Sequence, residues 1–322
     1  MKTIRWGILG LGKIAHSFTK DLLTVPGSQL YGVASRSQEK AEDFKTEYKA
    51  EKAYGSYEAL AKDPEIDIIY IATPHVRHCQ DSILCMTNGK AVLCEKPFAM
   101  NAEEVEKMIA CAKENNVLLM EALWTRMMPH FNFVLDELHS GKYGKIEKMA
   151  SDFCFEAEFK PEGRLWDKKL GGGALLDVGI YPIFCVLAIL GKPETISAKA
   201  KMGKTDVDIE NDITFTYNDG AKAFIKAGIA IKTPTTATII CENGLIYLHP
   251  RFHNTDKVTT ILEGVKTEHD FDYKSKGYNF EIMHMADLLR EGKKESGLMT
   301  HDLSRLIIDT LDKVREKIDL VY

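Results

Sequence analysis

The stretch Arg5–Ala15, RWGILGLGKIA, decides the fold of this chain. An apolar run ends at Gly10, Gly12 comes two positions later, and a helical pattern of apolar residues follows at once. A strand, a glycine-rich turn and a helix in this order suit a dinucleotide. Gly10 permits the tight turn, Gly12 lets the backbone approach a pyrophosphate, and the helix N-terminus attracts its charge. The same pattern also fits a plain strand-to-helix turn, so its surroundings must decide between the two.

The composition is that of a globular protein. The chain has 322 residues, of which 45% are hydrophobic and 28% charged, with a net charge of −5. Two domains are expected at this length. Charges of both signs are interspersed, with no basic block that would favour nucleic acid and no polybasic amphipathic segment that would favour a membrane surface. No apolar run is expected to span a membrane, and the first residues do not resemble a signal peptide.

The cysteine pattern indicates the cellular compartment of the protein. There are seven, they are scattered, and no CxxC pair occurs among them. Most lie in apolar patterns, which is typical of buried, reduced thiols. Together with the lack of a signal peptide, this predicts a cytoplasmic protein.

Strand and helix patterns alternate through the first third of the chain. Ile66–Ala72 and Ala91–Cys94 are continuous apolar runs, typical of strands buried on both faces of a parallel sheet. We therefore predict an α/β Rossmann domain with a parallel sheet over residues 1–123. The alternation stops near Arg126, and short strands with hairpin signals such as Asn218–Gly220 follow. Residues 124–322 are predicted to form an α+β domain with an antiparallel sheet that binds the substrate and other copies of the chain.

The end of the second predicted strand, Leu30–Ala34, indicates the cofactor. In a dinucleotide fold this strand end faces the adenosine ribose, where an acidic residue binds the 2′-hydroxyl of NAD and an Arg binds the 2′-phosphate of NADP. Ser35 and Arg36 follow the strand, whereas the first acid, Glu39, lies in the next helix. We therefore predict NADP. A solvated surface Arg is the alternative interpretation.

Polar residues also follow the later strands of the predicted parallel sheet, at the edge where such sheets bind ligands. Lys96 stands out because it directly follows a buried strand and its backbone is restricted by Pro97. The predicted cofactor site comprises Gly10, Leu11, Gly12, Lys13, Ile14, Ser35, Arg36, Thr73, Pro74, His75, His78, Glu95, Lys96, Trp124 and Arg126.

Further candidates lie in a helix predicted to begin at Gly171–Gly173 and to run to about Leu190. Asp177 and Tyr181 are four residues apart and therefore share one face. Their neighbours are nearly all apolar, which predicts a buried helix in which the carboxylate needs a partner. A structural acid and a core aromatic are the alternative interpretation of the pair. The predicted substrate pocket comprises Lys96, Trp124, Phe155, Trp166, Asp177 and Tyr181. Core packing is the alternative interpretation of Trp124, Phe155 and Trp166.

Four stretches resemble the glucose–fructose oxidoreductase, inositol dehydrogenase and rhizopine catabolism family (Gfo/Idh/MocA). They are GILGLGKIA, IYIATPHVRH, CEKPFAMN and GGGALLDVGIYPI, and they occur in the order found in the family. EALWTRMMP and RLWDKKLGGGALLDVGIYP are most similar to its branch of diol and xylose dehydrogenases. Tyr181, where many members carry His, is typical of that branch, whereas His75 stands where many carry Asn.

The resemblance implies a Rossmann domain followed by an open, mostly antiparallel sheet, and places Lys96, Asp177 and Tyr181 near the nicotinamide. Oxidation of an alcohol requires a proton acceptor beside the cofactor. We predict Tyr181 as this acid/base. An ammonium group from Lys96 would favour its phenolate form, and Asp177 would orient Lys96 or a substrate hydroxyl. The histidines show no metal-ligand spacing, so no metal is predicted.

The predicted function is an NADP-dependent oxidoreductase acting on a secondary alcohol or carbonyl of a sugar, a sugar derivative or a cyclic diol. A redox-dependent glycosidase with tightly held NAD remains an alternative. A non-enzymatic, dinucleotide-sensing regulator on the same fold is the other. Because an open sheet leaves one face uncovered, a homodimer or homotetramer is expected by analogy with the family.

Overall fold

The computed structural model describes residues 2–322, which divide into two compact units. Unit 1 contains Met1–Met127 and Lys274–Arg305, and unit 2 contains Met128–Tyr273 and Leu306–Tyr322. Lys274–Arg305 belongs to unit 1 because α8 (Tyr278–Arg290) packs against α1 (Lys13–Leu22), far from it in sequence.

Unit 1 is built on a six-stranded sheet in the order β3-β2-β1-β4-β5-β6, and every neighbouring pair is parallel. Its strands are β1 (Ile4–Leu9), β2 (Ser28–Ala34), β3 (Lys52–Tyr54), β4 (Ile68–Ile71), β5 (Ala91–Glu95) and β6 (Leu119–Ala122). Besides α1 and α8, its longer helices are α2 (Gln38–Tyr48), α3 (Tyr57–Lys62), α4 (His78–Thr87) and α5 (Ala102–Glu114). The short 3₁₀ turns η1 (His75–Arg77) and η2 (Trp124–Met127) follow β4 and β6.

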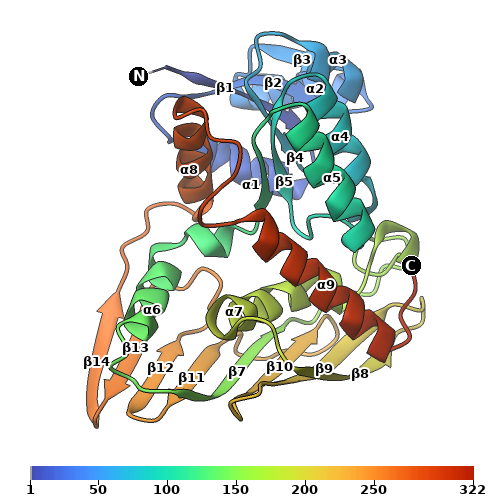
Figure 1. Ribbon diagram of the computed structural model, residues 1–322. Coiled ribbons are helices and arrows are strands. Elements are labelled where there is room, and N and C mark those ends of the chain that lie inside the picture. Colours follow the sequence, from blue (N-terminus) through green and yellow to red (C-terminus); the bar gives the residue numbers. More distant parts are fainter. Residues whose placement is uncertain (1) are drawn as a thin grey trace. The chain divides into compact units, whose positions relative to one another are not determined.

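Helices cover both faces of this sheet (Figure 1). On one face Phe18 of α1 stacks on Tyr70 of β4, with ring centroids 3.7 Å apart, and also contacts Trp6 of β1. On the other face a Cβ added to Gly7 would lie 3.3 Å from Leu60 of α3. Since neighbouring residues of a strand point to opposite faces, Trp6 and Gly7 separate the two helical layers. The predicted Rossmann arrangement is confirmed.

Unit 2 is built on an eight-stranded sheet in the order β14-β13-β12-β11-β7-β10-β9-β8. Its neighbours are antiparallel except β7 and β10, which are parallel. The strands are β7 (Ile146–Cys154), β8 (Thr195–Met202), β9 (Asp208–Thr216), β10 (Lys222–Gly228), β11 (Ala237–Cys241), β12 (Gly244–Leu248), β13 (Lys257–Leu262) and β14 (Val265–Asp270). The predicted mostly antiparallel sheet is confirmed.

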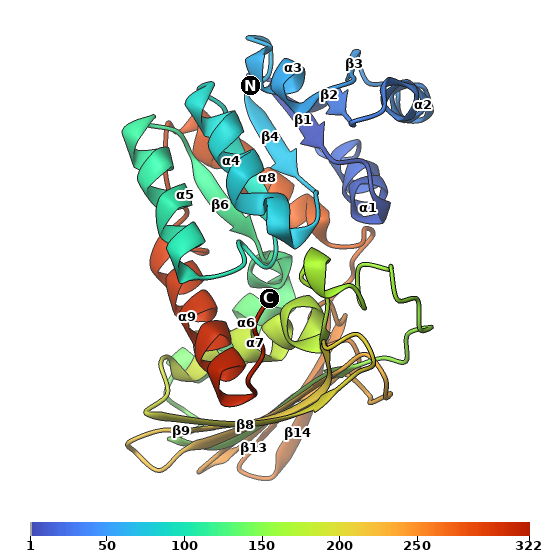
Figure 2. The same ribbon diagram turned by 90° about the vertical axis from the view of Figure 1, so that its right-hand side faces the viewer.

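Within unit 2, α6 (Pro129–His139) and α7 (Ile180–Leu190) lie on one side of the sheet (Figure 2). Phe131 and Phe184 of these two helices contact each other at 5.1 Å between ring centroids. Within the part of unit 2 that the structure describes, no helix covers the opposite face (Figure 2). The sheet is therefore open, as expected. The last helix, α9 (His301–Lys317), carries residues of both units.

One segment corrects the expectation that no apolar run is long enough to cross a membrane. Lys168–Leu190 meets that criterion by length and composition, and among residues 2–322 no other helix does. Most of its apolar stretch is buried inside the protein, where α7 packs against β7 and β10. A buried core helix meets the same criterion, and the packing of α7 fits that description.

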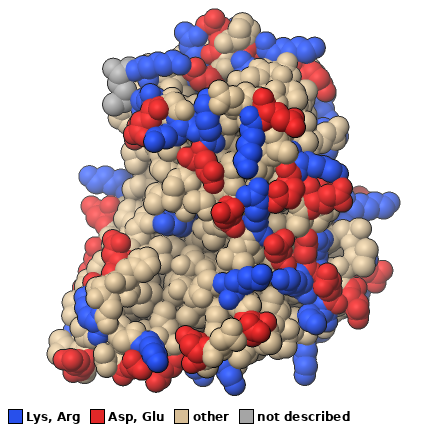
Figure 3. All heavy atoms as spheres, viewed as in Figure 1, with Lys and Arg blue, Asp and Glu red and all other residues tan. Residues whose placement is uncertain are grey.

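Charges of both signs are interspersed on the surface shown in Figure 3, as the sequence composition predicts. Many of them form local ion pairs. Arg305, for example, lies 2.5 Å from Glu106 and 2.8 Å from Asp302. Exposed pairs of this kind each contribute about 0–1 kcal/mol to stability, so they shape the surface more than they hold the fold.

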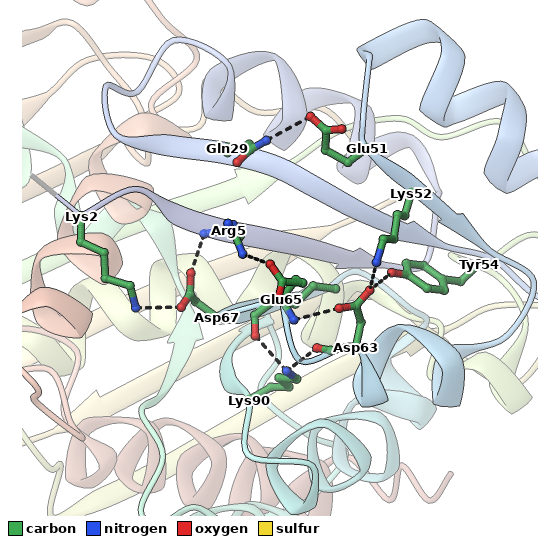
Figure 4. A network of polar contacts seen from close by, with 11 residues as sticks. Lys2, Arg5, Gln29, Glu51, Lys52, Tyr54, Asp63, Glu65, Asp67 and Lys90 are labelled. Atoms are coloured by element: carbon green, nitrogen blue, oxygen red, sulfur yellow. Dashed lines mark hydrogen bonds and ion pairs between the residues drawn. The ribbon is translucent and has the colours of Figure 1, made fainter.

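A polar network joins the amino-terminal ends of the strands in unit 1 (Figure 4). Asp63, which follows α3, accepts hydrogen bonds from Lys52 Nζ at 2.7 Å, from Tyr54 Oη and from the Glu65 backbone N–H at 2.8 Å. The Lys90 ammonium is buried and donates to the backbone carbonyls of Asp63 and Ile66 at 2.5 and 2.9 Å. These bonds fix the chain between α3 and β4.

The network also affects ionisation. Burial opposes the charged form of Asp63, but the hydrogen bonds from Lys52, Tyr54 and Glu65 outweigh it and lower the pKa of Asp63 to about 2. Burial lowers the pKa of Lys90 from its ordinary value. A depressed carboxyl pKa stabilises the fold above the pKa of the unfolded chain and ceases to do so as the pH falls through the folded value.

We expect Asp63→Asn to destabilise the protein by about 1–2 kcal/mol at neutral pH, because charge-assisted hydrogen bonds are lost. The loss stays this small because Lys52 is partly exposed and its charge is screened by solvent. The difference from wild type should shrink between about pH 4 and about pH 2. Urea unfolding across this range measures it. Glu58→Gln, an exposed change on α3, is the control and should stay near wild type throughout. A pH-independent effect of Asp63→Asn would contradict the electrostatic explanation.

Candidate active site

The glycine-rich turn after β1 has the geometry that a bound pyrophosphate needs. Gly10 has φ +92°, and a Cβ there would lie 2.9 Å from the carbonyl carbon and oxygen of Ala72. Gly12 is the N-cap of α1, and a Cβ there would meet nothing within 4 Å. No side chain caps this helix and no acid lies in its first turn. The open space beside Gly12 and the helix N-terminus without a side-chain cap suit an anion. Of the other predicted residues of this turn, Leu11 and Ile14 are half-buried and Lys13 is exposed.

The end of β2 is organised by serines. The Ser35 hydroxyl accepts a hydrogen bond from the Ser37 N–H at 3.2 Å, and Ser37 caps α2 through the Lys40 N–H at 3.3 Å. Arg36 is exposed between them. Ser35 and Arg36 are thus presented at the carboxyl edge of the sheet by the cap of the following helix.

A second arginine, which the sequence analysis did not single out, lies close to this strand end. Burial and Asp81 raise the pKa of Tyr57, while the guanidinium groups of Arg36 and Arg77 oppose the rise. Both arginines therefore act electrostatically on the same phenol. Arg77 is held by Asp81 at 2.6 Å. The only sequence signal for it is its position after β4.

The segment after β4 contains Thr73, Pro74, His75 and His78. Thr73 and His75 are buried, whereas Pro74 is exposed. The His78 ring is fully buried, with Nδ1 2.7 Å from the Pro97 carbonyl oxygen and Nε2 2.9 Å from that of Thr73. Burial lowers the pKa of His78, although both carbonyl contacts act in the opposite direction. His78 therefore ties the segments after β4 and β5 together, which is a supporting role.

The end of β5 presents Lys96. Glu95 Oε1 accepts a hydrogen bond from the Tyr70 hydroxyl, and Glu95 Oε2 accepts one from the Lys96 backbone N–H at 3.1 Å. The Lys96–Pro97 peptide bond is cis, which the strand-and-proline pattern does not predict. Lys96 is thus anchored at its backbone by a buried carboxylate.

Trp124 and Arg126 follow β6 in the turn η2. The Trp124 ring stacks on Tyr278 of α8, with centroids 4.5 Å apart. Arg126 Nε donates to the Leu298 carbonyl at 3.2 Å. Both residues belong to unit 1, together with the other predicted cofactor residues.

In unit 2 the candidates lie in a helix that differs from the predicted one. Instead of a continuous α-helix, a π-helical turn, η4 (Leu175–Gly179), precedes α7. The Leu175 N–H donates to Asp208 Oδ2 at 2.6 Å, and a Cβ at Gly173 would lie 2.1 Å from Asp208 Oδ1. Burial raises the pKa of Asp208 to about 6. The glycine run therefore lets Asp208 cap this turn, and wide turns of this type are frequent at functional sites.

Asp177 lies in the π-helical turn and is buried. Its Oδ1 accepts a hydrogen bond from Arg164 Nη1 at 2.6 Å. Arg164 comes from the irregular segment that follows β7 and precedes η4. The expected need for a partner is met in part by this arginine, which sequence reasoning did not identify. The only sequence evidence for a cationic partner was the buried Asp177 itself, because no cationic residue lies close to it in the sequence.

Tyr181, on the first turn of α7, is buried among aromatic rings. Its ring centroid lies 5.5 Å from that of Phe153 and 5.2 Å from that of His253. His253 and Phe153 are stacked at 4.6 Å with an interplanar angle of 8°. His253 follows β12 and was not predicted, because its loop carries no motif. An imidazole beside a phenol is a polar group that a substrate hydroxyl could contact.

Two further aromatic residues predicted for the substrate pocket, Phe155 and Trp166, belong to one region, because Phe155 packs against the apolar cluster that contains Trp166. Phe155 is half-buried and its ring contacts Phe153 at 6.4 Å, so it extends the aromatic group around Tyr181. Trp166 packs in an apolar cluster with Ala174 and Val178 and donates from Nε1 to the Glu158 carbonyl at 2.9 Å. Trp166 therefore anchors the irregular segment that carries Arg164.

Unit 1 thus brings the predicted cofactor residues to the ends of β1, β2, β4, β5 and β6, and unit 2 brings Asp177 and Tyr181 into one helical segment. Among residues 2–322, no group of three His, Cys, Asp or Glu side chains could hold a metal ion. The arrangement offers a backbone cradle for phosphates in one unit. In the other it offers a phenol, an imidazole and an ion-paired carboxylate.

This combination of fold and residues defines a class of oxidoreductases. The family described as "Oxidoreductase family, NAD-binding Rossmann fold" matches residues 4–123, and the Gfo/Idh/MocA C-terminal domain matches residues 133–247. The chain belongs to the Gfo/Idh/MocA family, and the resemblance seen in its motifs is confirmed. Unit 1 accordingly contains an NAD(P)-binding Rossmann fold.

Full-length relatives carry the name trans-1,2-dihydrobenzene-1,2-diol dehydrogenase. The mouse protein (Mus musculus) is 35% identical, with 99% of this chain and 98% of the relative covered. The human protein (Homo sapiens) is also 35% identical, again with 99% of this chain and 98% of the relative covered. Diol dehydrogenases are thus relatives over the whole chain.

Solved structures share the fold. A 3-ketoreductase from Actinomadura kijaniata, in complex with NADP and TDP-benzene, has a TM-score of 0.89 at 24% identity, and 98% of each chain is covered. An aldose–aldose oxidoreductase from Caulobacter crescentus, complexed with glycerol, has a TM-score of 0.90 at 20% identity, covering 99% of this chain and 98% of that one. Both support the assignment of the two-part architecture.

The two glycines of the turn should respond differently to an added methyl group. Gly12→Ala should leave the unfolding midpoint unchanged, because its Cβ meets nothing, and should weaken NADPH binding by about tenfold or more because it fills the approach to the helix N-terminus. Gly10→Ala should lower stability by about 1–3 kcal/mol through backbone strain at positive φ. Thermal unfolding and NADPH fluorescence titration measure the two effects. Equal NADPH affinity in Gly12→Ala and wild type would refute the cradle.

Proposed function

We propose that this protein is an NADP-dependent oxidoreductase that interconverts a secondary alcohol and a carbonyl on a sugar, a sugar derivative or a cyclic diol. The observation that carries the proposal is the buried pair of Asp177, in the π-helical turn, and Tyr181, on the first turn of α7, in a chain of an oxidoreductase family. Residues 1–123 hold the cofactor, residues 124–322 the substrate, and the protein works in the cytoplasm.

The preference for NADP rests on the end of β2. Arg36 follows this strand, and no acidic residue lies between β2 and α2. A 2′-phosphate therefore has a cationic partner, whereas a 2′-hydroxyl has no carboxylate acceptor. Arg77 acts on the same phenol, Tyr57, and adds a second guanidinium to this region. A ketoreductase with the same fold was solved with NADP.

The cofactor, when bound, supplies hydride transfer at the substrate carbon. Tyr181 exchanges the proton of the substrate hydroxyl, for which a phenol needs help because its ordinary pKa is about 10. Lys96 favours the phenolate form through its positive charge. Asp177, fixed by Arg164 at 2.6 Å, orients the groups around the reacting hydroxyl. Phe153 and His253 form the aromatic wall beside the phenol.

The test is turnover of a panel of aldoses and cyclic diols with NADP, read as the absorbance of NADPH, for wild type and Tyr181→Phe. We expect wild type to reduce NADP with at least one of these compounds and to use NAD less efficiently. Tyr181→Phe should lower kcat by about 10²- to 10⁴-fold, the usual contribution of an acid/base, while NADPH still binds. Near-wild-type turnover in Tyr181→Phe would remove Tyr181 from this role.

Tyr217→Phe is the matched control, because its hydroxyl bonds the Gly191 carbonyl at 3.2 Å and has no assigned chemical role. It should retain full activity. Glycoside cleavage without net NADPH change would identify the redox-dependent glycosidase instead. NADPH binding without any turnover would identify the regulator. Arg36→Ala should narrow the preference for NADP over NAD, and an unchanged preference would contradict the cofactor assignment.

We also propose that copies of the chain associate through the uncovered face of the eight-stranded sheet. This face carries a hollow lined by residues of β7, β9, β10 and β11, including Asp152, Thr214, Phe224, Lys226 and Thr238. Phe224 at its side is 40% exposed, which is high for a large apolar side chain in a sheet. A homodimer or homotetramer would cover it.

Phe224→Glu should shift the protein towards the monomer, because a carboxylate would be buried at the interface. Sedimentation velocity over a range of concentrations measures the shift. Leu298→Glu, which changes a comparably exposed apolar residue of unit 1, is the control and should leave the assembly intact. A wild-type monomer at every concentration would exclude the interface.

A further inference from the structure

Unit 1 buries three acidic side chains, one of which interacts electrostatically with the other two. Glu95 ends β5, Asp21 lies on α1 and Glu281 lies on α8. Glu281 has no exposed surface and interacts electrostatically with Glu95 and, less strongly, with Asp21. Tyr70 of β4 joins the group and is affected by both glutamates. Figure 1 shows α8 beside α1 in this unit.

The three carboxyl groups differ in the donors that reach them. Asp21 accepts from the backbone N–H groups of Tyr278 at 2.9 Å and Lys276 at 3.4 Å, so it caps the start of α8. Glu95 accepts from the Tyr70 hydroxyl and the Lys96 N–H. Neither oxygen of Glu281 has a hydrogen-bond partner among the described residues.

This difference determines where a proton resides. A buried carboxylate without a donor is far more costly than a neutral acid, whereas carboxylates that accept hydrogen bonds are stabilised in the charged form. The burial of Glu281 and the charge of Glu95 raise its pKa well above the ordinary value. A neutral acid carries one O–H donor, which requires an acceptor. Tyr278, one turn before Glu281 on α8, contacts Phe18, whose ring stacks on Tyr70, and the Tyr70 hydroxyl donates to Glu95. This packing brings α8 to the side of Tyr70 and Glu95, which makes the Glu95 carboxylate the acceptor for Glu281.

We propose that Glu281 is a positioning residue for the reaction: as a neutral acid it donates a hydrogen bond to Glu95, directly or through one buried water. Glu95 is thereby held against the Lys96 backbone, and α8 becomes part of the support of the site. This inference rests on the proposed role of Lys96. Glu281 itself acts only through Glu95.

One test does not depend on turnover. In Glu281→Gln the side chain keeps its shape but cannot ionise. The pKa of Glu281 is raised in the folded state. Wild type should therefore lose stability relative to Glu281→Gln as the pH rises above the pKa of a glutamate in the unfolded chain. The ratio of their unfolding equilibrium constants should change by about tenfold per pH unit until Glu281 ionises in the folded protein. Urea unfolding from about pH 5 to about pH 8 measures it. A ratio that does not change with pH overturns the proposal.

The second test uses kinetics of the full-length protein. Glu281→Gln still donates to Glu95 and should keep kcat within about twofold of wild type. Glu281→Leu removes the donor and should lower kcat by about tenfold or more, shift the pH profile of kcat and leave the KM for NADP nearly unchanged. Met285→Leu, a buried change one turn along α8, is the control for packing and should match wild type.

The outcomes distinguish a failure of the positioning role of Glu281 from a failure of the proposed function. Equal kcat and pH profile in Glu281→Leu and wild type, or an equal defect in the Gln and Leu variants, overturns the positioning role. If no substrate is turned over by wild type, the proposed function fails. The stability ratio of wild type to Glu281→Gln still decides whether Glu281 is neutral in the fold.

Discussion

The close approach of the β1–α1 turn to the carbonyl of Ala72 is the constraint on which unit 1 depends. Gly10 adopts φ +92° there, and a Cβ would lie 2.9 Å from that backbone. The turn can therefore pass over the end of β4 and direct α1 with its uncapped N-terminus outward. β1 and β4 pair in parallel beneath it, so their carboxyl ends lie at the same edge of the sheet.

Both units keep candidate side chains in place with buried polar contacts, and burial of a polar group is costly unless it is hydrogen-bonded. In unit 2, Asp208 caps the π-helical turn and Arg164 pairs with Asp177. In unit 1, Glu95 anchors the Lys96 backbone, and His78 connects the segments after β4 and β5. Rigid support of this kind holds reactive groups in one orientation, as catalysis requires.

The local patterns were sufficient for most of the elements. The Rossmann sheet and the change to antiparallel strands both followed from apolar periodicity and turn signals, because these depend on neighbours in sequence. The predictions missed where distant segments meet. Lys274–Arg305 joins unit 1, and the helix at Asp177 begins with a π-helical turn whose first N–H is capped by the distant Asp208.

The sequence by itself determined the family, the fold of each unit and the residue types of the candidate site. Each of these follows from contiguous motifs such as GILGLGKIA, CEKPF or GGGALLDVGIYP. Only the tertiary structure decided which side chains support them. Arg164 reaches Asp177, His253 reaches Tyr181, and the buried Glu281 interacts electrostatically with Glu95. These partners lie on separate loops and helices, and a contact between distant segments depends on packing, which no local pattern encodes.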